Sequence, residues 1–126
     1  MQPSTQVRTG AALAGLAVVA GAFGAHALQG RLDERALATY EVAVRYQICH
    51  ALALVLTGLL AERGWRTAGA ARAFVAGIAI FSGSLYALVL SGAKWLGAIT
   101  PIGGVLLVLG WLLLAWRGVA FRDADS

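Results

Sequence analysis

Four stretches of the chain consist almost entirely of apolar residues, and each is long enough to cross a bilayer. They cover about residues 9–28, 43–61, 73–91 and 96–116. A transmembrane helix needs roughly 20 mostly apolar residues to cross about 30 Å of hydrocarbon. The strands of a membrane barrel would instead alternate polar and apolar residues over about 10 positions. Because the apolar runs are continuous, the pattern predicts four transmembrane helices.

The segment between the first two stretches, residues 29–45, is the most polar part of the chain. Asp33 suits the N-cap of a helix, and Glu34 suits its first turn. At 100° per residue one face of this segment is charged, with Arg31, Glu34, Arg35, Glu41 and Arg45. No Gly or Pro interrupts residues 31–57. We therefore expect one long helix that begins as an amphipathic piece near the headgroups and continues into the membrane as the second span.

These patterns predict an all-α integral membrane four-helix bundle with an amphipathic helical extension before the second span. The composition agrees, with 60% hydrophobic and only 13% charged residues. A soluble domain is nearer half apolar and a quarter charged. With 126 residues there is no room for two domains. We expect residues 1–126 to form a single transmembrane domain.

The first apolar stretch also has features of a secretory signal peptide. Arg8 precedes it, and Ala25-His26-Ala27 resembles an Ala-x-Ala cleavage site. However, the stretch is longer than the usual signal core of about 7–15 residues, and His26 lies inside the cleavage site. We therefore expect the first span to be retained.

The distribution of Lys and Arg predicts the orientation of the spans. Six lie in the N-terminus, the second linker and the tail, and four lie in the first and third linkers. By the positive-inside rule both termini are expected in the cytoplasm. Aromatic side chains would then mark the two interfaces, with Trp65 and Trp116 on the cytoplasmic side and Tyr40, Tyr46 and Trp95 on the other.

The net charge of +4 changes this picture little, because the basic residues are scattered singly. A nucleic-acid interface needs clustered Lys and Arg, so we expect no nucleic-acid partner. The charges are instead typical of residues that flank spans and meet lipid headgroups of the bilayer. Cys49 is the single cysteine, which excludes an internal disulfide.

Five polar residues are predicted to gather near one membrane surface. His26 ends the first span, and Glu41, Arg45, Tyr46 and His50 begin the second. Glu41 and Arg45 are spaced i,i+4 and can pair, and Tyr46 and His50 have the same spacing. Since a short linker joins the two spans, we expect all five to form one hydrogen-bonded cluster.

This polar cluster leaves three roles open. Ionisable groups inside a membrane are functional candidates by default, so one role is a proton or small-solute pathway. A metal site is disfavoured, because structural zinc normally takes four ligands and Cys49 points away from His50. The third role is structural, with Glu41 and Arg45 neutralising each other while His50 bonds another helix. We expect the structural role, with no metal or cofactor.

Small residues recur within the spans and predict close helix packing. They include the spacing small-xxx-small, which lets helix backbones approach. The packing expected is within one chain, or else in a homo-oligomer or with other membrane proteins, at Gly15, Gly21, Gly24, Gly103 and Gly110. No G-x-S-x-G, H-E-x-x-H or phosphate-loop motif occurs. We therefore expect a non-enzymatic structural or accessory membrane component.

Two motifs resemble a known family. Gly-Ala-Phe-Gly-Ala-His at residues 21–26 and Arg-Tyr-Gln-Ile-Cys-His-Ala-Leu-Ala-Leu at residues 45–54 resemble the YgdD-like family of small membrane proteins, which is filed among domains of unknown function. The resemblance covers most of the chain and implies a multi-span protein of the bacterial inner membrane. It implies no activity, substrate or catalytic residue. Its motifs do fall on the predicted polar cluster.

Overall fold

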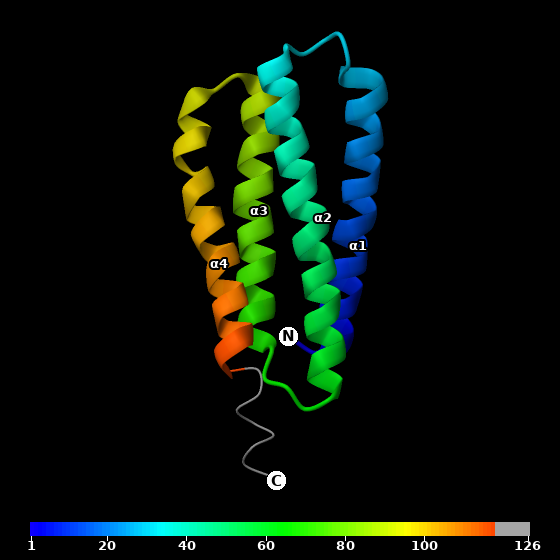
Figure 1. The fold of residues 1–126 in the computed structure, drawn as a ribbon, viewed down its shortest axis with the longest axis vertical. Coiled ribbons are helices and arrows are strands. Elements are labelled where there is room, and N and C mark those ends of the chain that lie inside the picture. The colour runs from blue at the N-terminus through cyan, green and yellow to red at the C-terminus, as the bar shows by residue number, and fades with distance from the viewer. Residues whose placement is uncertain (118–126) are drawn as a thin grey trace.

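The computed structural model describes residues 1–117, and these form four long helices joined by short connections (Figure 1). The described residues contain no strand, and all four helices are long and apolar enough to cross a membrane. This confirms the prediction of an all-α, four-span membrane protein. In chain order the elements are α1 (Pro3–Phe23), the π-helical turn η1 (Gly24–Leu28), α2 (Glu34–Glu62), α3 (Ala68–Ser91), the 3-10 turn η2 (Lys94–Ala98) and α4 (Thr100–Arg117).

Helix α2 runs unbroken from the polar linker into the membrane, as predicted. Its N-cap is Asp33, whose carboxylate Oδ1 accepts a hydrogen bond from the backbone N–H of Ala36 at 2.7 Å. Its 29 residues make it about 44 Å long at 1.5 Å per residue. That length exceeds the hydrocarbon layer of about 30 Å, and the charged residues Glu34, Arg35 and Glu41 are all in the first turns of α2, which agrees with the predicted extension before the second span.

Helices α1 and α3 begin earlier than the apolar stretches did, at Pro3 and Ala68 rather than near residues 9 and 73. The reason is that hydropathy marks only the part of a helix that must be apolar. A helix continues into the headgroup region because each further turn satisfies more backbone N–H and C=O groups.

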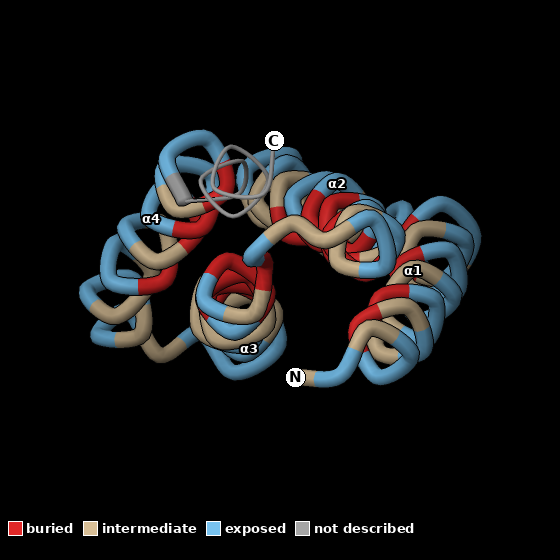
Figure 2. The backbone as a smooth tube through the Cα atoms, turned by 90° about the horizontal axis from the view of Figure 1, so that it is seen from below, coloured by how far each residue is buried: buried red, intermediate tan, exposed pale blue. Residues whose placement is uncertain are grey.

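The helices are arranged as a folded row, in which each packs mainly on its neighbour in the chain (Figures 1 and 2). Helices α2 and α3 lie in the middle, and α1 and α4 lie at the two sides (Figure 2). In the spanning windows, 44% of α2 and 39% of α3 is buried, against 17% of α1 and 22% of α4. The core therefore lies between α2, α3 and α4, around Phe74, Ile78 and Leu107.

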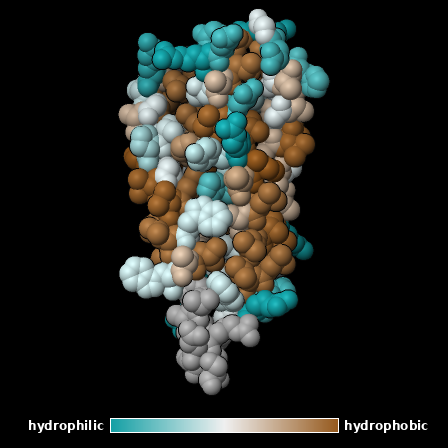
Figure 3. All heavy atoms as spheres, viewed as in Figure 1, coloured by the Kyte–Doolittle hydropathy of each residue, from teal (hydrophilic) through white to brown (hydrophobic). Residues whose placement is uncertain are grey.

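The outer surface is apolar across the middle of the bundle. Figure 3 shows hydrophobic residues on both sides of this band, with hydrophilic residues gathered near the upper end and continuing for some way down the centre of the face. Val18, Leu52, Val105 and Leu112 are each more than half exposed. In water a contiguous surface of this kind would drive association, whereas in a bilayer it is matched to the lipid chains.

Two of the predicted packing glycines allow α3 and α4 to approach closely. A Cβ atom at Gly103 would overlap the backbone N and Cα of Phe81, and one at Gly110 would lie 2.6 Å from ring carbons of Phe74. Such contacts are possible only without a side chain, which is the use of small residues at membrane helix interfaces.

The predicted glycines of the first span behave differently from one another. A Cβ at Gly24 would lie 2.5 Å from the Tyr40 ring, whereas one at Gly21 would make ordinary contact with Val44 at 3.4 Å. Gly15 is exposed and a Cβ there would meet no described atom within 4 Å, so it does not serve packing between the described helices. Its role in packing against a second copy or another membrane protein stays a prediction. The small-xxx-small spacing does not reveal which side of α1 faces α2, and Gly15 lies on the other side.

Candidate functional site

His50 is buried in the middle of the bundle with both ring nitrogens hydrogen-bonded. The indole N–H of Trp111 donates to Nε2 at 3.1 Å, and Nδ1 lies 2.8 Å from the backbone oxygen of Tyr46. An indole N–H can only donate, so Nε2 is the acceptor and Nδ1 carries the hydrogen that it donates to the Tyr46 carbonyl. This pairing holds the imidazole in one neutral tautomer and leaves neither nitrogen open for a ligand.

Aromatic rings from three helices surround this imidazole. The ring centroid of His50 lies 6.0 Å from that of Tyr46, 5.7 Å from that of Phe74 and 5.9 Å from that of Trp111. Phe74 and Trp111 meet edge to face at 5.0 Å, and Tyr46 packs on Phe81 at 4.7 Å. Edge and offset contacts of this kind favour a fixed arrangement of rings. The His50 nest, defined by these five residues, therefore joins α2, α3 and α4.

The other three members of the predicted cluster do not join it. His26, Glu41 and Arg45 are exposed, and no hydrogen bond or ion pair involves their side chains within residues 1–117. The prediction that all five side chains form one hydrogen-bonded cluster is therefore wrong. Glu41 and Arg45 lie on the outer side of α2, and His26 lies two residues, about 200° of helical rotation, from Gly24, which is buried against Tyr40. A functional role for these three residues stays a prediction.

Gln47 forms the polar link that connects three helices inside the bundle. Its Nε2 donates to the backbone oxygen of Leu13 in α1 at 2.8 Å, and its Oε1 accepts the hydroxyl of Tyr86 in α3 at 2.7 Å. Gln47 is only 6% exposed. Its position between Tyr46 and His50 in the sequence made it a neighbour of the predicted cluster, but nothing local identified Leu13 or Tyr86 as its partners.

Tyr40 makes the second link between α1 and α2. Its hydroxyl donates to the backbone oxygen of Ala20 at 2.6 Å, and its ring lies against Gly24 and 5.4 Å from the ring of Tyr86. The contact falls where α1 passes into η1. Tyr40 is 5% exposed, so its ring packs inside the bundle and does not face lipid as a residue of an aromatic belt would; its depth at the interface stays a prediction. The ring is drawn inward because glycine leaves room for it.

Within the described residues, every buried side-chain nitrogen and oxygen has a hydrogen-bond partner. Ser82 donates to the backbone oxygen of Ala43 at 2.7 Å, which adds a bond between α3 and α2. No group of three or more His, Cys, Asp or Glu side chains in this part of the chain could hold a metal ion. The buried polar side chains of the described residues therefore form hydrogen bonds within the chain, and none of them is left without a partner.

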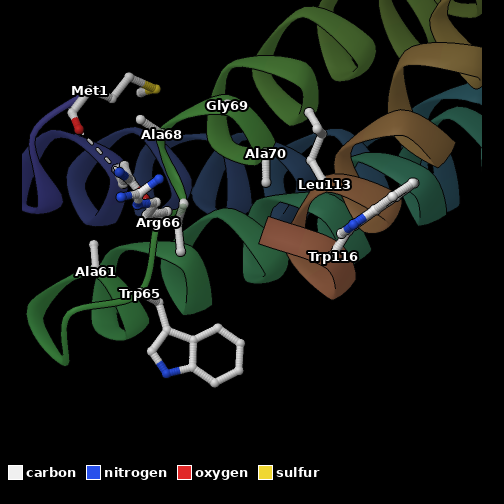
Figure 4. A pocket seen from close by; sticks show the side chains of 11 residues that line it. Met1, Ala61, Trp65, Arg66, Ala68, Gly69, Ala70, Leu113 and Trp116 are labelled. Carbon is white, nitrogen blue, oxygen red and sulfur yellow. Dashed lines mark hydrogen bonds between the residues drawn. The ribbon is translucent and has the colours of Figure 1, made fainter. Parts of the chain in front are cut away.

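A second candidate site lies at the opposite end of the bundle from the α1–α2 connection. A cavity of about 850 Å³ opens there between the N-terminus, the α2–α3 connection and the end of α4 (Figure 4). Its polar floor is the Gln6–Thr67 pair, in which the Thr67 hydroxyl lies 3.2 Å from Gln6 Oε1 and 3.0 Å from the backbone oxygen of Thr57. Gln6 and Thr67 are almost completely buried. Sequence reasoning missed both, since each is a single polar residue at a helix end.

Comparison with known proteins gives a family but no activity. A family model described as a protein of unknown function (DUF423) matches residues 20–104. A UPF0382 membrane protein of Staphylococcus aureus (strain bovine RF122 / ET3-1) is 48% identical over 113 residues, which cover 83% of this chain and 87% of the relative. UPF0382 membrane protein YwdK of Bacillus subtilis (strain 168) is 40% identical over 122 residues, covering 89% and 94%. No solved structure matches significantly. Both of these relatives carry the UPF0382 name, so a family of membrane proteins of unknown function is confirmed and the YgdD-like name that the two motifs suggested is not.

Proposed function

The chain belongs to the DUF423 family of proteins of unknown function, and we propose that it acts as a non-enzymatic structural or accessory component of the bacterial plasma membrane. One observation carries this proposal: the buried polar side chains of the described bundle are all paired within the chain. Pathways through membranes use ionisable groups that face a water-filled cavity or pair along a relay. The polar residues of this core instead link helix to helix.

The His50 nest supports the structural role over transport. A proton relay through His50 would need one ring nitrogen to exchange partners, yet one accepts from Trp111 and the other donates to the Tyr46 carbonyl. Both partners are also held by ring packing against Phe74 and Phe81. Moving a proton would require breaking this nest, which costs stability in three helices at once.

The accessory part of the proposal rests on the row arrangement. Helices α1 and α4 turn most of their spanning surface outward, where lipid chains, a second copy or another membrane protein would cover them. Both termini are proposed to lie in the cytoplasm, as the distribution of Lys and Arg predicts.

Two measurements on the full chain test this proposal. Co-purification from native membrane in mild detergent, with identification of partners by mass spectrometry, should recover a reproducible protein partner or a homo-oligomer. Liposomes that contain the protein should show no proton or small-solute flux above empty liposomes. A flux that His50→Phe abolishes without lowering thermal stability would replace the structural function with transport.

A further inference from the structure

The outer side of α2 carries charges that the bundle leaves unpaired, and we infer that this side binds the same side of a second copy of the chain. At 100° per residue its exposed residues fall within about 80° of one another. The α2 outer face is defined by Glu41, Arg45, Cys49, Leu52, Leu56 and Leu59. The inference rests on the proposed accessory role and deepens it, because it names the partner.

Arg45 sets the α2 outer face apart from the exposed faces of the other helices. The four apolar stretches contain a single Asp, Glu, Lys or Arg between them, and it is Arg45. Exposed residues of α1 and α4, such as Val18 and Val105, are matched to lipid chains. Ionisable side chains in a span are costly and usually pair with one another. Within residues 1–117, however, the side chains of Arg45 and Glu41 form no ion pair and no hydrogen bond.

A second copy supplies both missing charges at the right depth. Copies inserted in the same orientation pair about a two-fold axis along the membrane normal, so their α2 helices run parallel and each residue lies level with its own equivalent. Arg45 lies about 6 Å further along α2 than Glu41. Side chains lean toward the N-terminus of their helix, so Arg45 reaches back to the level of Glu41 in the second copy. The two-fold axis therefore forms two reciprocal Arg45–Glu41 pairs.

The signs of these two charges favour a second copy over a lipid headgroup. An anionic headgroup attracts Arg45 but repels Glu41, whereas a second copy offers each residue its opposite charge. The two Arg45 side chains would also repel each other across the axis if Glu41 were absent. The acid and the base are therefore both needed, and the face is complementary to itself.

Leucines continue the contact deeper in the membrane. Leu52, Leu56 and Leu59 are between 44% and 59% exposed on the same side of α2. Arg45, Leu52 and Leu59 are spaced seven residues apart, which is the repeat that keeps two parallel helices in contact along one side. Helices in membranes associate through side-chain packing and polar pairs. The leucines thus supply the packing, and the charged turn fixes the register.

The single cysteine of the chain reports this contact directly. Cys49 lies on the α2 outer face between the charged turn and the leucines, so a short bis-maleimide should cross-link two wild-type chains in membranes of expressing cells. Two controls move the thiol to exposed positions at a similar depth. Ala12 is next to Leu13, which bonds Gln47, and Leu112 is next to Trp111, which bonds His50.

These control chains are Cys49→Ala/Ala12→Cys and Cys49→Ala/Leu112→Cys. Labelling with a monofunctional maleimide corrects each yield for the reactivity of its thiol. Cross-linking should be strong through Cys49 and weak in both controls. Equal cross-linking at all three positions would show random collision and would overturn the assignment of the interface to α2.

A charge swap tests the reciprocal pairs. Arg45→Glu and Glu41→Arg each place like charges across the axis, so each should weaken dimerisation on the order of tenfold. The double variant Glu41→Arg/Arg45→Glu restores both pairs and should return close to the wild-type affinity. Energy transfer between copies with donor or acceptor fluorophores at the C-terminus, in liposomes of decreasing protein-to-lipid ratio, measures this affinity.

Melting temperatures in detergent separate loss of the dimer from misfolding. All three charge variants should melt like the wild type, because neither side chain contacts the rest of the described bundle. A double variant that dimerises no better than the single variants would overturn the reciprocal pairs. Wild-type energy transfer equal to that of an unrelated monomeric protein would overturn the pairing of two copies. The accessory role would survive that result if a different protein co-purified reproducibly.

Discussion

Trp111 of α4 donates its indole N–H to Nε2 of His50 in α2 at 3.1 Å, joining residues 61 positions apart. The extensive helix interfaces of the bundle lie between α1 and α2, α2 and α3, and α3 and α4. This hydrogen bond therefore ties the last helix to the second, across the Phe74 ring that lies against both residues.

Loss of the His50–Trp111 bond should weaken the fold without abolishing it. Side-chain hydrogen bonds in membranes average about 0.6 kcal/mol in double-mutant cycles, with a maximum of about 1.7. We expect a coupling energy of that size between His50→Phe and Trp111→Phe, measured by unfolding in a denaturing detergent. A coupling of zero would mean that the two side chains only pack.

The Gln47–Tyr86 pair should show the cost of removing one partner of a buried hydrogen bond. Tyr86→Phe leaves Gln47 Oε1 without its donor, which should cost about 1–3 kcal/mol of unfolding free energy. Adding Gln47→Leu removes the orphaned amide, although it also removes the bond to Leu13. We expect the double variant to lose less than the sum of the two single losses. A loss in the double variant equal to the sum of the two single losses would show that Tyr86 and Gln47 do not interact.

Gly103 and Gly15 provide a matched pair of glycine-to-alanine substitutions. Gly103→Ala would push a methyl group into the backbone of Phe81 and separate α3 from α4, at a cost of about 1–3 kcal/mol. Gly15→Ala meets no described atom and should leave stability within about 0.5 kcal/mol. Thermal unfolding in detergent measures both. Equal destabilisation would show that Gly15 faces a partner, as in an oligomer.

Arg45 should contribute little to the stability of the bundle. The pattern of the sequence paired it with Glu41, but both side chains are exposed and form no ion pair in the described part of the chain. We expect Arg45→Gln to change the unfolding free energy by less than about 0.5 kcal/mol, whereas His50→Ala should cost more. A large loss in Arg45→Gln would indicate a contact with lipid or a partner.

The termini should both be cytoplasmic and the first span should be retained. A reporter that is active only in the cytoplasm, fused to the C-terminus, should be active. Sequencing of the purified protein should find the N-terminus ahead of residue 9. An inactive reporter would reverse the orientation, and a chain that begins at Leu28 would show cleavage after Ala27.

The candidate site was predictable only in part. His50 stood out because an ionisable residue inside an apolar span is unusual, and its burial and pairing agree with the expected hydrogen bond to another helix. Its partner Trp111 carried no such signal, since tryptophan is ordinary in a span. Gln6 and Thr67 were also hidden, because a polar residue at a helix end is expected to face solvent.

By itself the sequence determined the number of spans, the helical class and the unbroken course of α2 from its Asp33 cap. These depend on local rules: the thickness of the hydrocarbon layer sets the length of an apolar run, and the backbone must be satisfied within each helix. Only the tertiary structure decided which side of each helix faces inward. The spans are apolar around most of their circumference, so no amphipathic pattern orients them, and close contacts at Gly103 and Gly24 set the rotation instead. That rotation buried Gln47 and His50 and left Arg45 outside.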